Sequence, residues 1–243
     1  MIILSVGMPR AGSGWHYNLI NDLVTASGGQ DGRVIRRRYL LSPILTEVNC
    51  NIGALTRKRV YPLMVPALLG NTFSVKTHAG PKPWTLPLIE KGRIKPAYIY
   101  RDPRAALLSA YEYGRKGEDN SRPNAFSALK TIEDAITFMA GYVRISQDWL
   151  RIPQALAVRY EDFLADYDAE TARLLPFLGI QETTPQIAAV IDKHRPGQAK
   201  PGQPGLHFSK GQPERFREVL TPQQLTRCAD VFGDYLDKMG YQI

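Results

Sequence analysis

The stretch that decides the fold is Ile2-Ile3-Leu4-Ser5-Val6-Gly7-Met8-Pro9-Arg10-Ala11-Gly12-Ser13-Gly14, near the start of the chain. Its first five residues are mostly apolar and partly β-branched, which predicts a buried strand. From Trp15 onward, apolar residues recur at helical spacing. A strand, a glycine-containing turn and a helix form an anion site, because backbone N–H groups and the helix dipole converge there. Arg10 adds a permanent positive charge, so the turn is predicted to bind a phosphate.

The rest of the chain alternates between strand-like and helix-like segments. Further strands are predicted at 72–78, 94–100 and 155–160, and helices at 84–91, 103–111, 132–150, 161–178, 184–194 and 222–239. Within 33–72, Pro62 and Pro66 predict only short helices and loops. This alternation predicts an α/β fold: a single domain over 1–243, with a mainly parallel central sheet flanked by helices and a P-loop-like N-terminus. Ligands of such sheets bind beyond the carboxyl ends of the strands, where Arg10, His78 and Arg101 fall.

Composition favours an anionic partner but does not identify it. The 243 residues include 31 Lys and Arg against 23 Asp and Glu, a net charge of +8. The two cysteines are far apart and match no metal or redox spacing, so a reduced, cytoplasmic setting is expected. No run is long enough to span a membrane, and the start lacks the features of a signal peptide, so a soluble protein is expected. No metal-ligand cluster is evident, and the sequence predicts no oligomeric state.

Single motifs leave several interpretations open. The spacing from Gly7 to Gly12 is that of a Walker A loop, but Ser13-Gly14 stands where Lys-Ser/Thr should be. Taken alone, Trp15 is more often ordinary core and His78 is more often a structural histidine. His16, His194 and His207 show no motif and are given no role. The loop alone therefore supports nothing more specific than phosphate binding.

Five stretches taken together resemble the sulfotransferases that use 3′-phosphoadenosine 5′-phosphosulfate (PAPS). They are Pro9-Arg10-Ala11-Gly12-Ser13-Gly14-Trp15, Lys76-Thr77-His78, the segment from Arg101 to Ser109, Arg159-Tyr160-Glu161-Asp162, and Lys210-Gly211 followed by Phe216. The resemblance implies that the first loop holds the 5′-phosphosulfate and that Arg101 and Ser109 hold the 3′-phosphate. It also implies that Trp15 and Tyr160 lie near the adenine. The residues that it assigns to the cofactor are Arg10, Ala11, Gly12, Ser13, Gly14, Trp15, Arg101, Ser109, Tyr160, Lys210 and Gly211.

The resemblance also implies the reaction, which is transfer of a sulfuryl group from PAPS to a hydroxyl or amine without a metal. His78 is implied to be the general base, while Lys76 and Arg10 stabilise charge on the transferred group. Only a neutral imidazole accepts a proton, so the rate is expected to rise with pH as the histidine titrates. The chain departs from the family at Arg10, where a lysine is usual, and at Gly14 and Ser209, where threonine and arginine are usual.

The acceptor is expected to be a small molecule or a glycan, bound by 33–72, 114–150 and 198–213. Basic runs in these segments favour an acidic acceptor, whereas Tyr39, Tyr61 and Trp84 favour an aromatic one. Two other functions stay open at this point. One is a P-loop kinase or NTPase, and the other is a non-catalytic polyanion-binding protein, although no nucleic-acid-binding motif is present and no nucleic-acid partner is expected.

Overall fold

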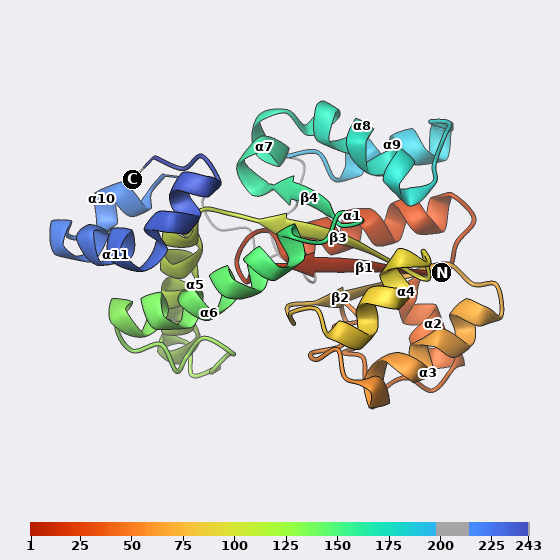
Figure 1. Ribbon diagram of the computed structural model, residues 1–243, viewed down its shortest axis with the longest axis horizontal. Coiled ribbons are helices and arrows are strands. Elements are labelled where there is room, and N and C mark those ends of the chain that lie inside the picture. Colours follow the sequence, from red (N-terminus) through yellow and green to blue (C-terminus); the bar gives the residue numbers. More distant parts are fainter. Residues whose placement is uncertain (198–213, 243) are drawn as a thin grey trace. The chain divides into compact units, whose positions relative to one another are not determined.

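The computed structural model describes residues 1–197 and 214–242, and its strands form one parallel sheet (Figure 1). The strands are β1 (Ile2–Gly7), β2 (Phe73–Thr77), β3 (Ile94–Tyr100) and β4 (Leu156–Arg159), in the spatial order β2-β1-β3-β4. The helices are α1 (Ser13–Ala26), α2 (Gly32–Arg38), α3 (Arg57–Leu68), α4 (Leu86–Glu90), α5 (Pro103–Asp119), α6 (Ile132–Leu150), α7 (Tyr160–Ala165), α8 (Tyr167–Leu178), α9 (Pro185–Lys193), α10 (Phe216–Val219) and α11 (Pro222–Lys238), with the 3-10 helix η1 (Pro83–Thr85) before α4. The predicted α/β class with a parallel sheet is confirmed.

The chain divides into two compact units. Unit 1 contains residues 1–7, 12–100 and 148–197, and therefore the whole sheet with helices α1 to α4 and α7 to α9. Unit 2 contains residues 8–11, 101–147 and 214–242, and therefore α5, most of α6, α10 and α11. The assignment of 1–243 to one sulfotransferase-like domain stays a prediction.

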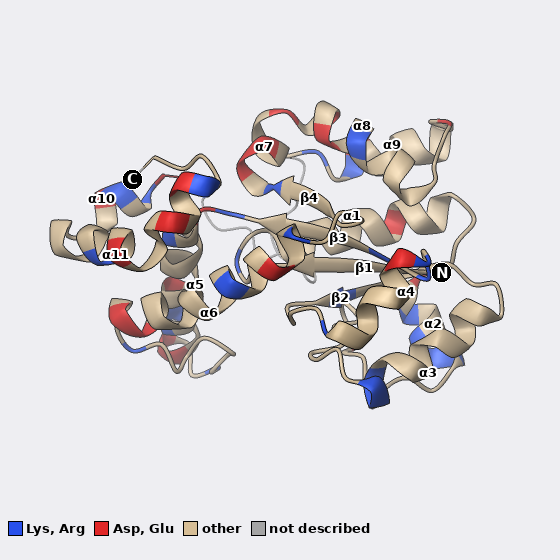
Figure 2. Ribbon diagram, viewed as in Figure 1, with Lys and Arg blue, Asp and Glu red and all other residues tan. Residues whose placement is uncertain are grey.

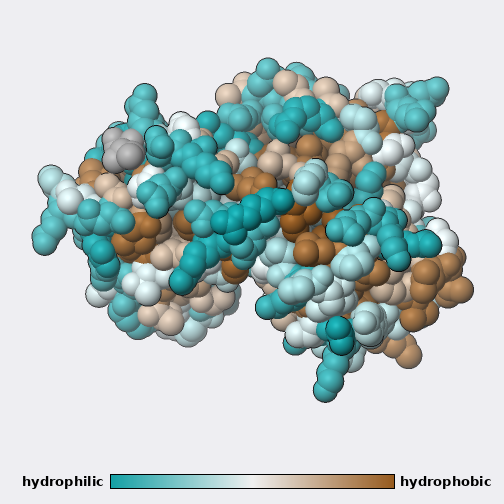
Figure 3. Space-filling view, viewed as in Figure 1, coloured by the Kyte–Doolittle hydropathy of each residue, from teal (hydrophilic) through white to brown (hydrophobic). Residues whose placement is uncertain are grey.

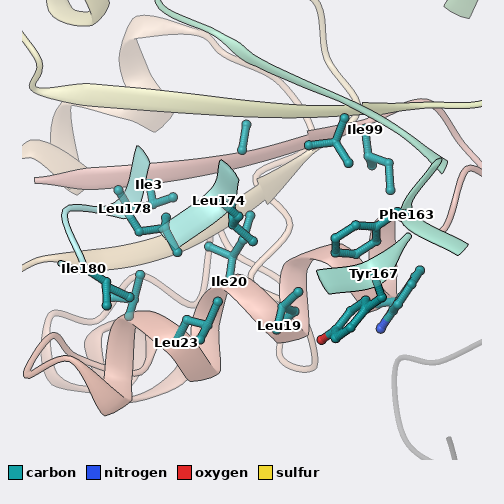
Figure 4. Close-up of a cluster of buried hydrophobic side chains, with 14 of the residues drawn as sticks. Ile3, Leu19, Ile20, Leu23, Ile99, Phe163, Tyr167, Leu174, Leu178 and Ile180 are labelled. Atoms are coloured by element: carbon teal, nitrogen blue, oxygen red, sulfur yellow. The ribbon is translucent and has the colours of Figure 1, made fainter. Parts of the chain in front are cut away.

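One face of the sheet in unit 1 packs against α1, α7 and α8 (Figure 4). All six residues of β1 are buried, because this strand lies between β2 and β3 and is covered on both faces. The buried side chains of this cluster include Ile3, Leu19, Ile20, Leu23, Ile99, Phe163, Tyr167, Leu174, Leu178 and Ile180. This packing anchors both β1 and α1, the elements before and after residues 8–11, in the same core.

Two segments differ from the sequence-based expectations. Helix α3 continues through Pro62 and Pro66, where short helices and loops were expected. Its buried side chains, Val60, Leu63 and Met64, pack into unit 1, and this packing outweighs the lost backbone hydrogen bonds. The helix expected over 161–178 is divided into α7 and α8 at Asp166, whose carboxylate accepts a hydrogen bond from the Ala169 N–H. A side-chain cap thus starts a new helix there.

Among the residues described, no helix has both the length and the apolar character needed to cross a membrane.

Candidate functional site

The loop after β1 begins with a strained turn. The Ala11 N–H donates a hydrogen bond to the Met8 carbonyl at 3.2 Å, with Pro9 and Arg10 at the two central positions. Arg10 has a φ of 64°, in the left-handed region that glycine usually occupies. Proline followed by a residue with positive φ is the pattern of a type II turn. The turn therefore holds an arginine where its own backbone prefers glycine, and such strain concentrates at functional sites.

In unit 2, this turn carries a group of two guanidinium ions and a hydroxyl. Arg10 Nε donates to Ser109 Oγ on α5 at 3.1 Å, and the Arg10 guanidinium carbon lies 4.5 Å from the centre of the Tyr113 ring. Arg101 Nη1 donates to the Arg10 carbonyl at 3.2 Å. Arg101 is only 9% exposed. Permanent charges and a hydroxyl donor in one place are suited to a phosphate or sulfate group.

The family resemblance implies that Arg10 lies at the sulfuryl end of the cofactor and that Arg101 and Ser109 lie at the 3′-phosphate. The structure brings all three residues together in unit 2. It also adds Tyr113, whose ring supports the Arg10 guanidinium through a cation–π contact that no sequence motif indicated.

In unit 1, the remainder of the loop packs closely against its neighbours. Gly12 has a φ of 76°, and a Cβ at this position would lie 2.8 Å from carbons of the Tyr160 ring. A Cβ on Gly7 would lie 2.6 Å from the Cβ of Ser13, the buried first residue of α1. Both glycines of the Walker-like spacing are therefore required by close packing, and the Tyr160 ring lies against Gly12.

His78 follows β2 directly and is held by the backbone of β1. Its Nδ1 lies 2.6 Å from the Gly7 carbonyl oxygen. A carbonyl only accepts, so Nδ1 carries the proton and Nε2 keeps its lone pair. Burial and the nearby Lys76 ammonium lower the His78 pKa to about 4, although the hydrogen bond to Gly7 acts in the opposite direction. The imidazole is thus neutral at pH 7, and its titration is expected near pH 4 rather than near 6.5.

Lys76 lies on the same face of the sheet as a second histidine, which sequence reasoning left without a role. Lys76 is 7% exposed and pairs in register with Ser5 on β1, whose Oγ lies 3.1 Å from Nδ1 of His16. His16 is fully buried, and burial together with the Lys76 charge lowers its pKa to about 3. The only signal for it in the sequence was its position on the apolar face of α1. Unit 1 therefore contains two neutral imidazoles near one buried ammonium. We call His16, Lys76 and His78 the histidine–lysine cluster.

Trp15, expected against the adenine, is mostly covered by core side chains. It is 7% exposed, and its ring centroid lies 4.6 Å from that of Phe163 and 6.0 Å from that of Tyr167. Its Nε1 donates to the His194 carbonyl at 2.8 Å. Packing within unit 1 accounts for most of its surface.

Another tryptophan supports the segment that carries His78. Trp149 is fully buried, and its Nε1 donates to the Ala79 carbonyl at 3.0 Å, one residue after the imidazole. It was predicted only as part of a long helix. Lys210 and Gly211, also expected at the cofactor, lie outside the described residues. Within 1–197 and 214–242, no cluster of three or more His, Cys, Asp or Glu residues could hold a metal ion.

The chain as a whole is similar to known proteins of one family. A profile of the sulfotransferase domain family matches residues 2–240. No curated protein sequence matches the chain significantly. Similar solved structures include retinol dehydratase in complex with androsterone and the inactive cofactor PAP, with 18% identity, a TM-score of 0.60, and coverage of 97% of this chain and 80% of that chain.

Two further structures show the same fold. A mouse sulfotransferase complexed with PAP has 16% identity and a TM-score of 0.62, covering 97% of this chain and 84% of that chain. A sulfotransferase from Mycobacterium avium has 16% identity and a TM-score of 0.51, covering 100% of this chain and 77% of that chain. At these identities the likeness concerns the fold.

Proposed function

The chain belongs to the sulfotransferase domain family, and from that premise we propose that it transfers a sulfuryl group from PAPS to a hydroxyl or amine of an acceptor, with His78 as general base. The observation that carries this proposal is the hydrogen bond from His78 Nδ1 to the Gly7 carbonyl at 2.6 Å. It fixes the tautomer whose Nε2 can accept a proton.

His78 acts on the acceptor in this scheme. Its Nε2 accepts the proton of the acceptor O–H or N–H while the oxygen or nitrogen attacks sulfur. With a pKa lowered to about 4, the imidazole is ready to accept at neutral pH. A bound anionic donor raises this pKa, because a nearby negative charge favours the imidazolium, and so strengthens the base when the cofactor is present.

Lys76 supplies the positive charge near this base. Its ammonium acts on the pKa of both His16 and His78, which indicates that it lies within electrostatic range of each. We assign Lys76 to stabilising the charge that develops on the sulfuryl oxygens and the leaving phosphate. His16, neutral and fully buried, adds no second positive charge to this part of unit 1.

The group of Arg10, Arg101 and Ser109 fits a phosphate of the cofactor. PAPS supplies the activated sulfuryl group, and its 3′-phosphate distinguishes it from ATP. The hydrogen bond from Arg10 Nε to Ser109 Oγ supports a shared role of these residues at the 3′-phosphate. Arg10 is thereby assigned to the same end of the cofactor as Arg101, rather than to the sulfuryl end.

The test combines binding with transfer. Calorimetry is expected to show that PAP binds much more tightly than AMP, and labelled sulfate is expected to pass from PAPS to an acceptor. The acceptor panel includes a phenol, a sugar, an amine and two alcohols, androsterone and retinol, which occur in complexes with similar folds. Equal affinity for PAP and AMP together with magnesium-dependent ATP hydrolysis would support a kinase or NTPase instead. Steeply salt-dependent polyanion binding without transfer would support a non-catalytic binder.

A further inference from the structure

Apolar side chains are exposed to solvent along α3 in unit 1. The large hydrophobic side chains exposed in the described part of the chain are Leu40, Val48, Tyr61, Val65, Leu68, Leu69 and Val219. Four of these seven fall between residues 61 and 69, and Leu68 and Leu69 are 66% and 68% exposed. Isolated exposed leucines are ordinary, but a cluster of them marks an interaction surface.

The spacing of these residues places them on one face of the helix. Tyr61, Val65, Leu68 and Leu69 follow at intervals of four, seven and eight from Tyr61, which is one helical stripe. The opposite face of α3 carries the buried Val60, Leu63, Met64 and Pro66. The helix is therefore apolar on both sides, although only one side is covered within unit 1.

Leu40 lies just after α2, next to a residue that contacts the segment following α3. Asn71 Nδ2 donates to the Tyr39 hydroxyl at 3.2 Å, which ties the chain after α3 to the end of α2. Leu40 is 83% exposed. We call the surface formed by Leu40, Tyr61, Val65, Leu68 and Leu69 the α3 patch, and Figure 3 shows hydrophobic side chains on the surface over this part of the molecule.

Basic side chains frame the α3 patch. Arg37 and Arg38 are exposed at the end of α2, and Arg57 and Lys58 are exposed at the start of α3. Figure 2 shows Lys and Arg positions on α2 and at the beginning of α3. The segments 32–45 and 56–73 contain no aspartate or glutamate. The rim of the α3 patch is therefore complementary to a negatively charged partner.

Two aromatic side chains lie beside each other at this surface. The ring centroids of Tyr61 and Trp84 are 5.5 Å apart at an interplanar angle of 71°. Tyrosine and tryptophan are enriched where one part of the ring meets hydrocarbon and the other meets water. Both rings are on the same unit as the apolar stripe and its basic rim.

We propose that the α3 patch binds the surface of a membrane that contains anionic lipids. A helix lying in the plane of the interface buries an apolar stripe among the acyl chains, while flanking lysines and arginines reach the headgroups. The α3 patch provides the stripe, the basic rim and the interfacial aromatics. The charge complementarity selects an anionic bilayer over a neutral apolar partner. This proposal is independent of the chemistry proposed for His78.

The test is cosedimentation of the full chain with vesicles of phosphatidylcholine, alone or mixed with phosphatidylserine. The wild-type protein is expected to bind the mixed vesicles at least tenfold more tightly than the neutral ones. The triple variant Val65→Ser/Leu68→Ser/Leu69→Ser is expected to lose at least tenfold of that affinity. Arg37→Gln/Arg38→Gln is expected to lose roughly tenfold and to reduce the preference for phosphatidylserine.

Matched controls come from other exposed positions. Val219→Ser on α10 removes an exposed apolar side chain elsewhere, and Arg144→Gln/Lys238→Gln on α6 and α11 removes two exposed positive charges elsewhere. Both variants are expected to bind like the wild type. Circular dichroism and thermal melting show whether each variant is folded. As a second readout, Leu68→Trp is expected to show a blue-shifted emission with the mixed vesicles, because its side chain enters the bilayer.

Three results would overturn the proposal. The first is no binding of wild-type protein to either vesicle. The second is equal loss of binding in the control variants, which would indicate attraction by net charge alone. The third is a stable dimer in light scattering that the triple variant converts to monomer without any effect on vesicles, which would make a second copy the occupant of the α3 patch.

Discussion

The histidine–lysine cluster of unit 1 and the arginine cluster of unit 2, which consists of Arg10, Arg101 and Ser109, differ in how their residues are held and charged. His78, His16 and Lys76 lie on or against the sheet, and burial sets the protonation of the two histidines. Arg10 and Arg101 are held by a strained turn and by contacts with Ser109 and Tyr113. Arginine keeps its charge when buried, whereas histidine loses it. The sheet thus supports groups whose chemistry depends on their surroundings, and the turn supports permanent charges that only need to be positioned.

The largest effect is expected from removing the base. His78→Asn keeps a polar side chain near the Gly7 carbonyl but has no group that can accept the acceptor's proton. Transfer is expected to fall by roughly 10²–10⁴-fold, the usual contribution of a positioned general base. PAP affinity, measured by calorimetry on the same preparation, is expected to stay within a few-fold of the wild type. Parallel loss of PAP binding would assign His78 to the structure of the site instead.

The lowered pKa values in the histidine–lysine cluster predict that the protein is less stable in acid. The pKa values of His78 and His16 are lowered from 6.5 to about 4 and about 3. Below pH 6.5 the unfolded chain therefore binds protons that the folded chain does not, and the free energy of unfolding falls as the pH drops toward 4. Each histidine contributes a slope of up to about 1.4 kcal/mol per pH unit.

Urea titrations at several pH values measure this slope. His78→Asn is expected to reduce the slope of the free energy of unfolding against pH, between pH 4 and 6, by the contribution of one histidine. An unchanged slope in the variant would mean that His78 has an ordinary pKa in the folded protein.

The arginine cluster is expected to determine the preference for PAP over AMP. Arg101→Ala removes a buried charge proposed to contact the 3′-phosphate, and should cost about 2–4 kcal/mol of PAP binding. AMP binding should change little, because AMP lacks that phosphate. Arg115→Ala, at an exposed position on α5, serves as the control. Equal losses for PAP and AMP would assign Arg101 to another role.

The smallest effect concerns the strained turn. Arg10→Gly and Arg10→Ala both remove the contacts to Ser109 and Tyr113, but only glycine suits a φ of 64°. The glycine variant is therefore expected to be more stable than the alanine variant by about 1 kcal/mol in denaturant titrations. Both are expected to bind PAP more weakly than the wild type. Equal stability of the two variants would show that the turn relaxes to another conformation.

The sequence predicted the parts that depend on local pattern. The apolar runs at 2–6 and 94–100 located the central strands, and the family resemblance placed His78 at a strand end. The contacts between distant residues could not be predicted. The Gly7 carbonyl that fixes the His78 tautomer is 71 residues away, and Ser109 is 99 residues from Arg10. His16 has no motif, because its role depends on Ser5 and Lys76, which only the folded sheet places beside it.

In helix α3, contacts with distant residues outweigh a local sequence signal. Its prolines gave a strong local signal against a long helix, yet packing of its buried face maintains it. Its exposed apolar stripe was equally hidden, because Tyr61 and Val65 cannot be distinguished from buried apolar residues before the partners of the helix are known.

The measurement that tests the central claim most directly is ¹⁵N NMR of the histidine rings, with His78→Asn used to assign the His78 signals. From pH 5.5 to 8, Nδ1 of His78 is expected to stay protonated and Nε2 to stay unprotonated, as the bond to Gly7 and the lowered pKa require. Addition of PAP is expected to move the pKa upward without changing the tautomer. A proton on Nε2 of the neutral ring, or a titration near pH 6.5 without PAP, would contradict the account.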